Sequence, residues 1–500
     1  MMRRFNATRT FFGGTISVKR LLTAGCAGLL GALLMLVGPL PTVHGQSGAR
    51  DPGVRGGSVD AGRPLASLSP AQRKFFDEAL DIFKEINSVK GEAAGADSVG
   101  LGPRFNGDSC AGCHAQPAVG GTSPSTRHFP SIGPNPQTLV ANREGATNRI
   151  PSFVTADGPV REARFKHPVD ARGQINFQRL DGSVHPLFTI TGRSDATNTI
   201  GITGKPQTCH LAQPDFEAMM RAGNLSFRIP TPLFGSGLIE NIADEAILAN
   251  MNAGVQDKRA LGITGRPNRN GNDASIARFG WKAQNKSLLL FAGEAYNVEQ
   301  GVANELFQNE RGNHGEVLPM ACLFNSTPED GTKFDKPGGG AQISDMEAFA
   351  VFMRFLDAPA PSASNPGGPG SIANGKRLFS EVAKCALCHT PALPAAPSST
   401  TPGLGPRMAN LYSDLLLHNM GRGLADGIQQ GDAGPDEFRT APLWGLGQRI
   451  FFLHDGRTSD LQEAIRQHAS PNSEANASVD LFLGLSERNK QDVLNFLRSL

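Results

Sequence analysis

Two five-residue stretches of this chain have the residue types and spacing that attach a haem covalently. Cys110-Ala-Gly-Cys-His114 and Cys385-Ala-Leu-Cys-His389 both read C-x-x-C-H, which is the attachment signature of a c-type haem. The two cysteines form thioethers with the two vinyl groups of one macrocycle. The adjacent histidine reaches the iron from one side.

Zinc binding fits the same pattern less well. A zinc knuckle needs four ligands from two cysteine pairs, typically with tens of residues between them. Here residues 110–114 and 385–389 are far apart, and each stretch already has its own histidine. Two cysteines at this spacing also occur in thioredoxin-like redox pairs, and a short pattern can match by chance. We expect two covalently bound haem c groups, attached through Cys110, Cys113, Cys385 and Cys388 and ligated by His114 and His389.

The composition indicates a globular protein. Of 500 residues, 39% are hydrophobic and 19% are charged, and the 59 glycines and 35 prolines indicate long irregular connections around compact helical pieces. Residues 1–45 hold five basic residues and no acidic one, which leaves 43 basic and 46 acidic residues in the remainder. This balance gives no basic field for nucleic acid, so we expect no nucleic-acid partner.

The first 45 residues have the features of an export signal. A basic stretch precedes the apolar run 21–40, and Val43-His-Gly45 places small residues at positions −3 and −1 before Gln46. We therefore expect a signal peptide over residues 1–45 and a periplasmic location. An uncleaved membrane anchor is the alternative, because the apolar run is about long enough to span a bilayer.

Export also bears on the two cysteines that remain. Of the seven cysteines, Cys26 belongs to the signal and four are assigned to haem, so Cys209 and Cys322 are left. In an oxidising compartment a structural disulfide is the simplest assignment for this pair. Ligation of some group by Cys209 and the adjacent His210 is the alternative.

Each motif is expected to lie between an opening helix and a closing helix. Ser69 is a good N-cap for a helix whose apolar residues recur at helical spacing as far as Ile86. Gly375-Lys-Arg-Leu-Phe379 precedes the second motif in the same way. The segments 343–356 and 485–500 share a pattern of Ser and acid followed by an amphipathic helix, and each is expected to pack across the opening helix of its unit.

These repeats predict a mainly α fold with two cytochrome c-like helical domains, residues 65–358 and 371–500, joined by a Pro/Gly/Ser-rich linker. Phe279-Gly-Trp281 followed by Ser287-Leu288 mirrors Phe452-Leu-His454 followed by Asp460-Leu461. The first of these elements lies much farther from its haem histidine than the second. The first domain is therefore expected to contain a loop-rich insertion at about 125–270, with β-prone pieces and one helix over 214–222.

The sixth ligand of each iron decides what a haem can do. In the second domain, Leu461, Ile465 and His468 recur on one face of a helix that Ser459 and Gln462 would cap. We take His468 as the ligand, with Met420 as the rival and a satisfied core histidine as the alternative. In the first domain, His128 is a candidate ligand, and a loop histidine is the interpretation we favour.

These residues resemble a known family. Pro442-Leu-Trp-Gly-Leu-Gly447, His454-Asp-Gly-Arg457, Arg228-Ile-Pro-Thr-Pro232 and Arg278-Phe-Gly-Trp281 look like the di-haem oxidoreductase family of peroxidase-like proteins. The resemblance covers about residues 65–500. That family is similar to bacterial di-haem cytochrome c peroxidases, to the maturation enzyme of methylamine dehydrogenase and to rubber oxygenases.

The resemblance implies roles for three residues. Trp281 matches the tryptophan that lies between the two haems, and His468 matches the sixth ligand of the C-terminal haem, a methionine in the peroxidases. Asn297-Val-Glu299-Gln-Gly301 matches a peroxidase pattern with one deletion, which makes Glu299 the acid–base carboxylate. An ordinary surface glutamate after a helix is the alternative. Phe291 stands near the position of an active-site glutamine of the peroxidases.

We therefore expect an exported di-haem c-type oxidoreductase that is peroxidase-like and passes electrons from the C-terminal haem to a reactive N-terminal haem. A small redox protein or cytochrome would be the electron donor, and a peroxide or small organic molecule the substrate. An oxidase or oxygenase of an organic substrate, and a non-catalytic electron carrier, are the alternatives. A membrane is a partner only if the signal is uncleaved.

Overall fold

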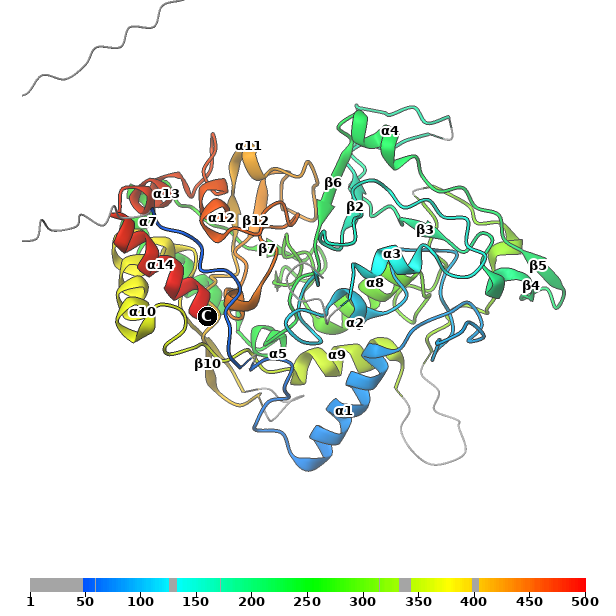
Figure 1. Cartoon of the computed structure of the whole chain (residues 1–500), viewed down its shortest axis with the longest axis horizontal. Coiled ribbons are helices and arrows are strands. Elements are labelled where there is room, and N and C mark those ends of the chain that lie inside the picture. Colours follow the sequence, from blue (N-terminus) through cyan, green and yellow to red (C-terminus); the bar gives the residue numbers. More distant parts are fainter. Residues whose placement is uncertain are drawn as a thin grey trace, which may run out of the picture. The chain divides into compact units, whose positions relative to one another are not determined.

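The computed structural model describes residues 48–58, 60–125, 133–170, 172–313, 315–331, 343–397 and 404–500. All of these belong to a unit that spans Ser47–Leu500. Figure 1 shows short helices and small sheets joined by long irregular connections. The expected signal peptide and His128 lie outside the described residues.

Two pairs of packed helices hold the C-x-x-C-H motifs in place. Helix α1 (Pro70–Lys84) packs on α9 (Asp345–Phe355), and α10 (Gly368–Arg377) packs on α14 (Glu487–Ser499). The expectation that each closing segment packs on the opening helix of its unit is thus confirmed.

Local sequence explains both packed pairs. Ser69 forms a capping box with Gln72 at the start of α1, and the ring of Phe83 lies 4.6 Å from that of Phe352 on α9. In α10, a Cβ atom on Gly375 would lie 1.9 Å from the carbonyl oxygen of Asp492 on α14. Only glycine permits the two helix backbones to approach this closely.

The remaining elements are short. The other helices are α2 (Cys110–Cys113), α3 (Pro136–Val140), α4 (Phe216–Arg221), α5 (Ser236–Glu240), α6 (Asp244–Asn252), α7 (Val255–Ala260), α8 (Leu288–Gln300), α11 (Gly421–Leu424), α12 (Leu461–Gln467) and α13 (Asn476–Leu483), with 3-10 or π turns η2 (Ser194–Ala196), η3 (Met320–Cys322), η4 (Leu378–Val382), η5 (Cys385–Leu387) and η7 (Leu446–Gln448). The strands are β1 (Arg104–Phe105), β2 (Glu162–Phe165), β3 (Phe188–Thr189), β4 (Thr197–Ile200), β5 (Pro206–Thr208), β6 (Leu225–Arg228), β7 (Asn268–Arg269), β8 (Ile276–Ala277), β9 (Leu393–Ala395), β10 (Arg407–Ala409), β11 (Leu417–Asn419) and β12 (Glu437–Arg439).

The prediction of a mainly α fold is wrong. Helices make up 31% of the described residues and strands 13%, so the protein is mixed α/β. In the described residues the strands form six two-stranded sheets, β1–β3, β2–β6, β4–β5, β7–β8, β9–β10 and β11–β12, all antiparallel. Buried backbone needs hydrogen-bond partners, and in the long connections these ladders supply them. Strands of two to four residues are too short to show in a periodicity pattern.

The expected insertion contains β2–β6, β4–β5 and α4, which pack in an apolar core shared with residues outside it, among them Leu101, Phe105 and Phe324. Its one predicted helix, over 214–222, is α4. The predicted disulfide between Cys209 and Cys322 is confirmed. This bond is buried and ties the insertion to the segment that follows α8.

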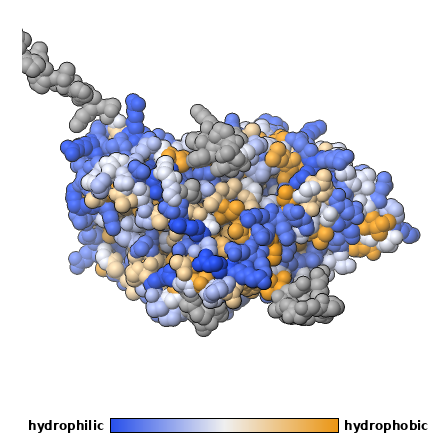
Figure 2. Space-filling model, turned by 60° about the horizontal axis from the view of Figure 1, so that its bottom comes forward, coloured by the Kyte–Doolittle hydropathy of each residue, from blue (hydrophilic) through white to orange (hydrophobic). Residues whose placement is uncertain are grey.

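The face drawn in Figure 2 is mainly hydrophilic, with scattered apolar side chains. Figure 2 shows one small apolar patch at the end of the molecule where β4 and β5 lie. Ile200 and Ile202 are exposed in that region. No helix in the described ranges is both long enough and apolar enough to cross a membrane.

Candidate functional site

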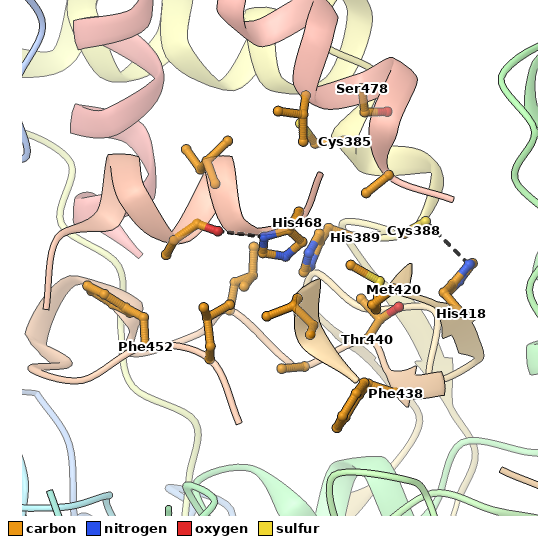
Figure 3. A pocket seen from close by; sticks show the side chains of 18 of the residues that line it. Cys385, Cys388, His389, His418, Met420, Phe438, Thr440, Phe452, His468 and Ser478 are labelled. Atoms are coloured by element: carbon orange, nitrogen blue, oxygen red, sulfur yellow. Dashed lines mark hydrogen bonds between the residues drawn. The ribbon is translucent and has the colours of Figure 1, made fainter. Parts of the chain in front are cut away.

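The second C-x-x-C-H motif opens onto a largely apolar cavity of about 210 Å³, which we call the His389 cavity. Cys385, Cys388, His389 and His468 all line it. Figure 3 shows the rings of His389 and His468 side by side in the middle of the cavity, with the two cysteines along one edge. The structure thus brings together the haem residues that the sequence predicted for this half.

The two histidines are held in matching orientations. His389 Nδ1 lies 3.0 Å from the carbonyl oxygen of Tyr412, and His468 Nδ1 lies 2.7 Å from that of Ala464. A ring that donates from Nδ1 keeps Nε2 unprotonated, which is the form that binds a metal. Burial lowers the pKa of both rings, that of His389 to about 4, so both are neutral at physiological pH.

His468 caps the C-terminus of α12. The predicted helix cap was wrong in detail, because Asp460 rather than Ser459 accepts the hydrogen bond, from the backbone of Glu463. Met420 also faces this cavity (Figure 3), so the structure places both candidate ligands there. His468 as the ligand stays a prediction.

A third histidine in this cavity, His418, was missed by sequence reasoning. Its Nε2 lies 2.9 Å from Asp414 Oδ2 and its Nδ1 lies 2.7 Å from Glu474 Oε2. Both ring nitrogens are therefore engaged with carboxylates, and the ring is structural rather than a free ligand. Its sequence spacing gave no signal of this role.

The first C-x-x-C-H motif opens onto a second cavity, of about 170 Å³, which we call the His114 cavity. Cys110, Cys113 and His114 line it, and His114 Nδ1 lies 3.0 Å from the carbonyl oxygen of Gly121. Burial lowers the pKa of His114 to about 4. Among the described residues that line this cavity, His114 is the only histidine.

The two halves repeat the element that follows each motif. Phe279 bridges to Asn285 and Phe452 bridges to Thr458, with the same spacing. Helices α8 and α12 then begin at equivalent residues, Leu288 and Leu461, after N-caps that both accept from the third helical residue.

Ala295 on α8 stands at the position that His468 has at the end of α12. Both stand seven residues after the first residue of their helix. Ala295 lines the His114 cavity, and its methyl group cannot ligate iron. The difference between the two cavities thus arises at one equivalent helix position.

Glu299 lies at the end of α8 and lines the His114 cavity rather than the outer surface. Asn106 Nδ2 donates to its carboxylate at 3.0 Å. Burial, reinforced by the neighbouring carboxylate of Glu162, raises the pKa of Glu299 to about 8. Its catalytic role stays a prediction.

Glu162, on β2 of the insertion, was not found from the sequence. Its side chain lies within hydrogen-bonding reach of Glu299 and lines the same cavity. Burial alone would raise the pKa of Glu162, but the charges of Arg164 and Arg228 outweigh it and lower that pKa. Arg164 Nε also donates to the Glu162 carboxylate. The pair therefore divides into an ionised Glu162 and a protonated Glu299 at neutral pH.

Trp281 lines both cavities. Its Nε1 donates to the carbonyl oxygen of Ile229 at 3.0 Å, and its ring meets that of His454 edge-on at 6.4 Å. His454 in turn stacks on Phe438 at 4.3 Å. The predicted position of Trp281 between the two sites agrees with this geometry, and its role in catalysis stays a prediction.

The side chains that line both cavities are of the types that bind haem. Each cavity combines two free cysteines with a motif histidine whose Nδ1 is held by a backbone carbonyl oxygen, and with apolar walls. In the His389 cavity a second imidazole is oriented in the same way. These are the residues that would hold two haems and ligate their irons.

Comparison with solved structures gives weak similarity. The chain is similar to a MauG-like protein associated with microbial copper homeostasis, at 15% identity over 52% of this chain and 89% of that one, with a TM-score of 0.26. It is also similar to the diheme peroxidase BthA of Burkholderia thailandensis, at 14% identity over 60% and 91%, with a TM-score of 0.27.

A third similarity is to the hydrazine synthase of Kuenenia stuttgartiensis, at 18% identity and a TM-score of 0.21. It covers 31% of this chain, which spans about half (55%) of the length of that one. No curated protein sequence matches the chain.

The family comparison is more extensive. Residues 178–500 match the family described as "Di-haem oxidoreductase, putative peroxidase". That match covers more than half of the 500 residues and includes both Trp281 and the second C-x-x-C-H motif. The chain therefore belongs to the di-haem oxidoreductase family.

Proposed function

We propose that this protein is an exported di-haem c-type peroxidase whose substrate reacts in the His114 cavity. The observation that carries the proposal is that an alanine on α8 stands at the position of the candidate ligand His468. His468 faces the His389 cavity, whereas Ala295 lines the His114 cavity. One cavity therefore has a second imidazole oriented like that of the motif histidine, and the other offers space beside a carboxylate pair.

Covalently bound haem in each cavity would supply the iron and the electrons for peroxide reduction, in which two electrons and two protons convert ROOH into ROH and water. The protein must remove a proton from one peroxide oxygen and deliver it to the other. Glu299 is the group placed for this transfer, because it lines the cavity and is held by Asn106.

Burial and, after it, the charge of Glu162 set the protonation state of Glu299. Arg164 and Arg228 keep Glu162 ionised, and its negative charge favours the neutral form of Glu299. Only the ionised form of Glu299 accepts a proton from the peroxide, so activity rises with pH through its pKa. The released proton stays on Glu299 until the leaving oxygen takes it.

The other parts of the proposal concern delivery and location. Trp281 contacts both cavities and gives electrons a short route between them. The buried disulfide between Cys209 and Cys322 supports an oxidising, periplasmic location. We expect a small redox protein or cytochrome to donate the electrons and the four motif cysteines to carry thioethers.

The test uses the Ala295→His variant of the two-haem protein. We expect the half-reduced wild-type protein to react with hydrogen peroxide in stopped-flow spectroscopy. In Ala295→His the first iron gains a second imidazole, so its spectrum becomes low-spin and the reaction is lost. Ala292→Ser on the same helix is the control and keeps the reaction, because a hydroxymethyl group does not ligate haem iron.

Two results would overturn the proposal. One is a wild-type protein whose half-reduced form does not react with peroxide. The other is an Ala295→His protein that contains both haems, shows the low-spin spectrum and still reacts at the wild-type rate. Mass spectrometry of each protein establishes that two haems are covalently bound.

A further inference from the structure

Two arginines in the wall of the His389 cavity are buried without a carboxylate partner. Arg439 and Arg449 are each only 8% exposed. Neither forms an ion pair with any residue in the described parts of the chain. The guanidinium of Arg449 has no hydrogen-bond partner there either.

The contrast with the other buried arginines is clear. Of the nine buried arginines in the described chain, six form ion pairs with Asp or Glu. The third unpaired one, Arg55, lines neither haem cavity. Burying an unpaired guanidinium costs several kcal/mol, and two adjacent ones also repel each other. A buried anion is therefore needed beside Arg439 and Arg449.

Their few polar contacts leave most donors unused. Arg439 Nε donates to the carbonyl oxygen of Gly280 at 3.0 Å, and Nη1 lies 3.5 Å from that of Thr440. The carboxylate whose charge acts on Arg439 is that of Asp414, and it already accepts a hydrogen bond from His418. Burial and the neighbouring Arg449 lower the pKa of Arg439 to about 10, and burial lowers that of Arg449 to about 10. Both remain charged at neutral pH, so two positive charges lie in this wall without a carboxylate partner among the described residues.

The position of the pair indicates which anion it takes. Both arginines line the His389 cavity, and neither lines the His114 cavity. Figure 3 shows Cys385 above the paired histidines and Cys388 to their right, whereas Phe438 and Phe452 lie below them.

The chemistry of haem supplies the matching anion. Its two propionate carboxylates lie on the edge of the macrocycle away from the vinyl groups, and the vinyl edge is fixed at Cys385 and Cys388. Guanidinium groups pair with carboxylates through parallel hydrogen bonds. We propose that Arg439 and Arg449 bind the two propionate carboxylates of the haem in the His389 cavity.

This assignment connects the haem edge to the wall between the cavities. The backbone nitrogen of Arg439 donates to the carbonyl oxygen of Trp281 at 2.9 Å. Both arginines also line a small cavity of about 30 Å³ that Trp281 and Phe291 share. The propionate edge therefore faces the segment that carries Trp281.

The test measures the midpoint potential of the low-spin haem in the two-haem protein. The variants are Arg449→Gln, Arg439→Gln and the charge-preserving Arg449→Lys. Loss of a positive charge beside the propionates disfavours the reduced haem. We expect each Gln variant to lower the ratio of reduced to oxidised low-spin haem at least tenfold at a fixed potential, which is about 59 mV for one electron. Arg449→Lys keeps most of the wild-type value. Arg488→Gln removes an exposed arginine with the same change of charge and has no effect.

A second readout separates binding from a general charge effect. The propionate bending band in the resonance Raman spectrum shifts when its hydrogen bonds are lost, so both Gln variants should move it and Arg488→Gln should not. If Arg449→Gln does not fold, Arg439→Gln carries the test.

Unchanged potential and unchanged band in the Gln variants would overturn the proposal. It would also be overturned if the wild-type potential varied with chloride concentration and Arg449→Gln removed that dependence without moving the band. In that case the pair binds a free anion instead.

Discussion

Replacing Glu162 with Gln should shift the pH dependence of catalysis without touching a haem residue. Two carboxylates about 4 Å apart repel by about 4 kcal/mol at an effective dielectric constant of about 20, which corresponds to about 3 pKa units. Burial is the larger cause of the raised pKa of Glu299 and remains in the variant. We therefore expect the pKa of Glu299 to fall by about 1–3 units from its value of about 8.

The sign of the effect follows from the role of Glu299 as a base. Wild-type kcat/KM for hydrogen peroxide should rise with pH to a midpoint near the pKa of Glu299, because only the ionised carboxylate accepts a proton. In Glu162→Gln this midpoint moves to lower pH, so relative activity at about pH 6 increases.

The assay is steady-state peroxide reduction with a reduced dye as electron donor, from acid to alkaline pH. Glu245→Gln, which removes an exposed glutamate on α6, is the control and keeps the wild-type midpoint. Glu299→Gln should lose the pH-dependent limb altogether and slow turnover about 10²–10⁴-fold. An unchanged or higher midpoint in Glu162→Gln would refute the reasoning about the pair.

Two further substitutions test the remaining assignments. His468→Met should keep both haems and raise the midpoint potential of the C-terminal haem by part of the range of about 0.8 V that axial ligands span; an unchanged spectrum and potential would show that His468 is not the ligand, and Met420 would replace it. The double variant Cys209→Ser with Cys322→Ser should lose about 2–5 kcal/mol of unfolding free energy in urea while its visible spectrum stays the same. Equal urea midpoints for the variant and the wild-type protein would show that the disulfide does not stabilise the fold.

The start of the first helix was predictable because it is read from a few neighbouring residues. The capping box of Ser69 and the packing of α1 on α9 follow from short, local patterns. The disulfide was predictable by elimination, since only Cys209 and Cys322 were unassigned.

Contacts made across long stretches of chain were not predictable in this way. Glu162 and Glu299 are separated by more than one hundred residues, and β2 in the insertion has no pattern that points to the His114 cavity. The unpaired state of Arg439 and Arg449 depends on the absence of nearby carboxylates in three dimensions, which no spacing reveals. The short strands were not predicted for a related reason. Each is stabilised by its partner strand, and its own sequence is too short to show a periodicity.

The internal repeat explains how two nearly identical attachment motifs support different chemistry. The bridges at Phe279 and Phe452 are equivalent, and the residues two positions later, Trp281 and His454, contact each other at 6.4 Å. The repeated elements therefore meet at the wall between the cavities. Because the C-x-x-C-H motifs and the first histidine are the same in both halves, neither can cause the difference.

The difference must come from the helix that follows each repeated element. Helix α12 ends at the residue before His468, whereas α8 carries Ala295 at the equivalent position and continues to Glu299. Helix α8 thus has a methyl group in place of the imidazole, and its six additional residues add a carboxylate beside the same kind of cavity. The insertion then contributes Glu162 and Arg164, which set the charge of that carboxylate. Without Glu162 from the insertion, Glu299 would have a lower pKa, so the insertion moves the activity that depends on this carboxylate to higher pH.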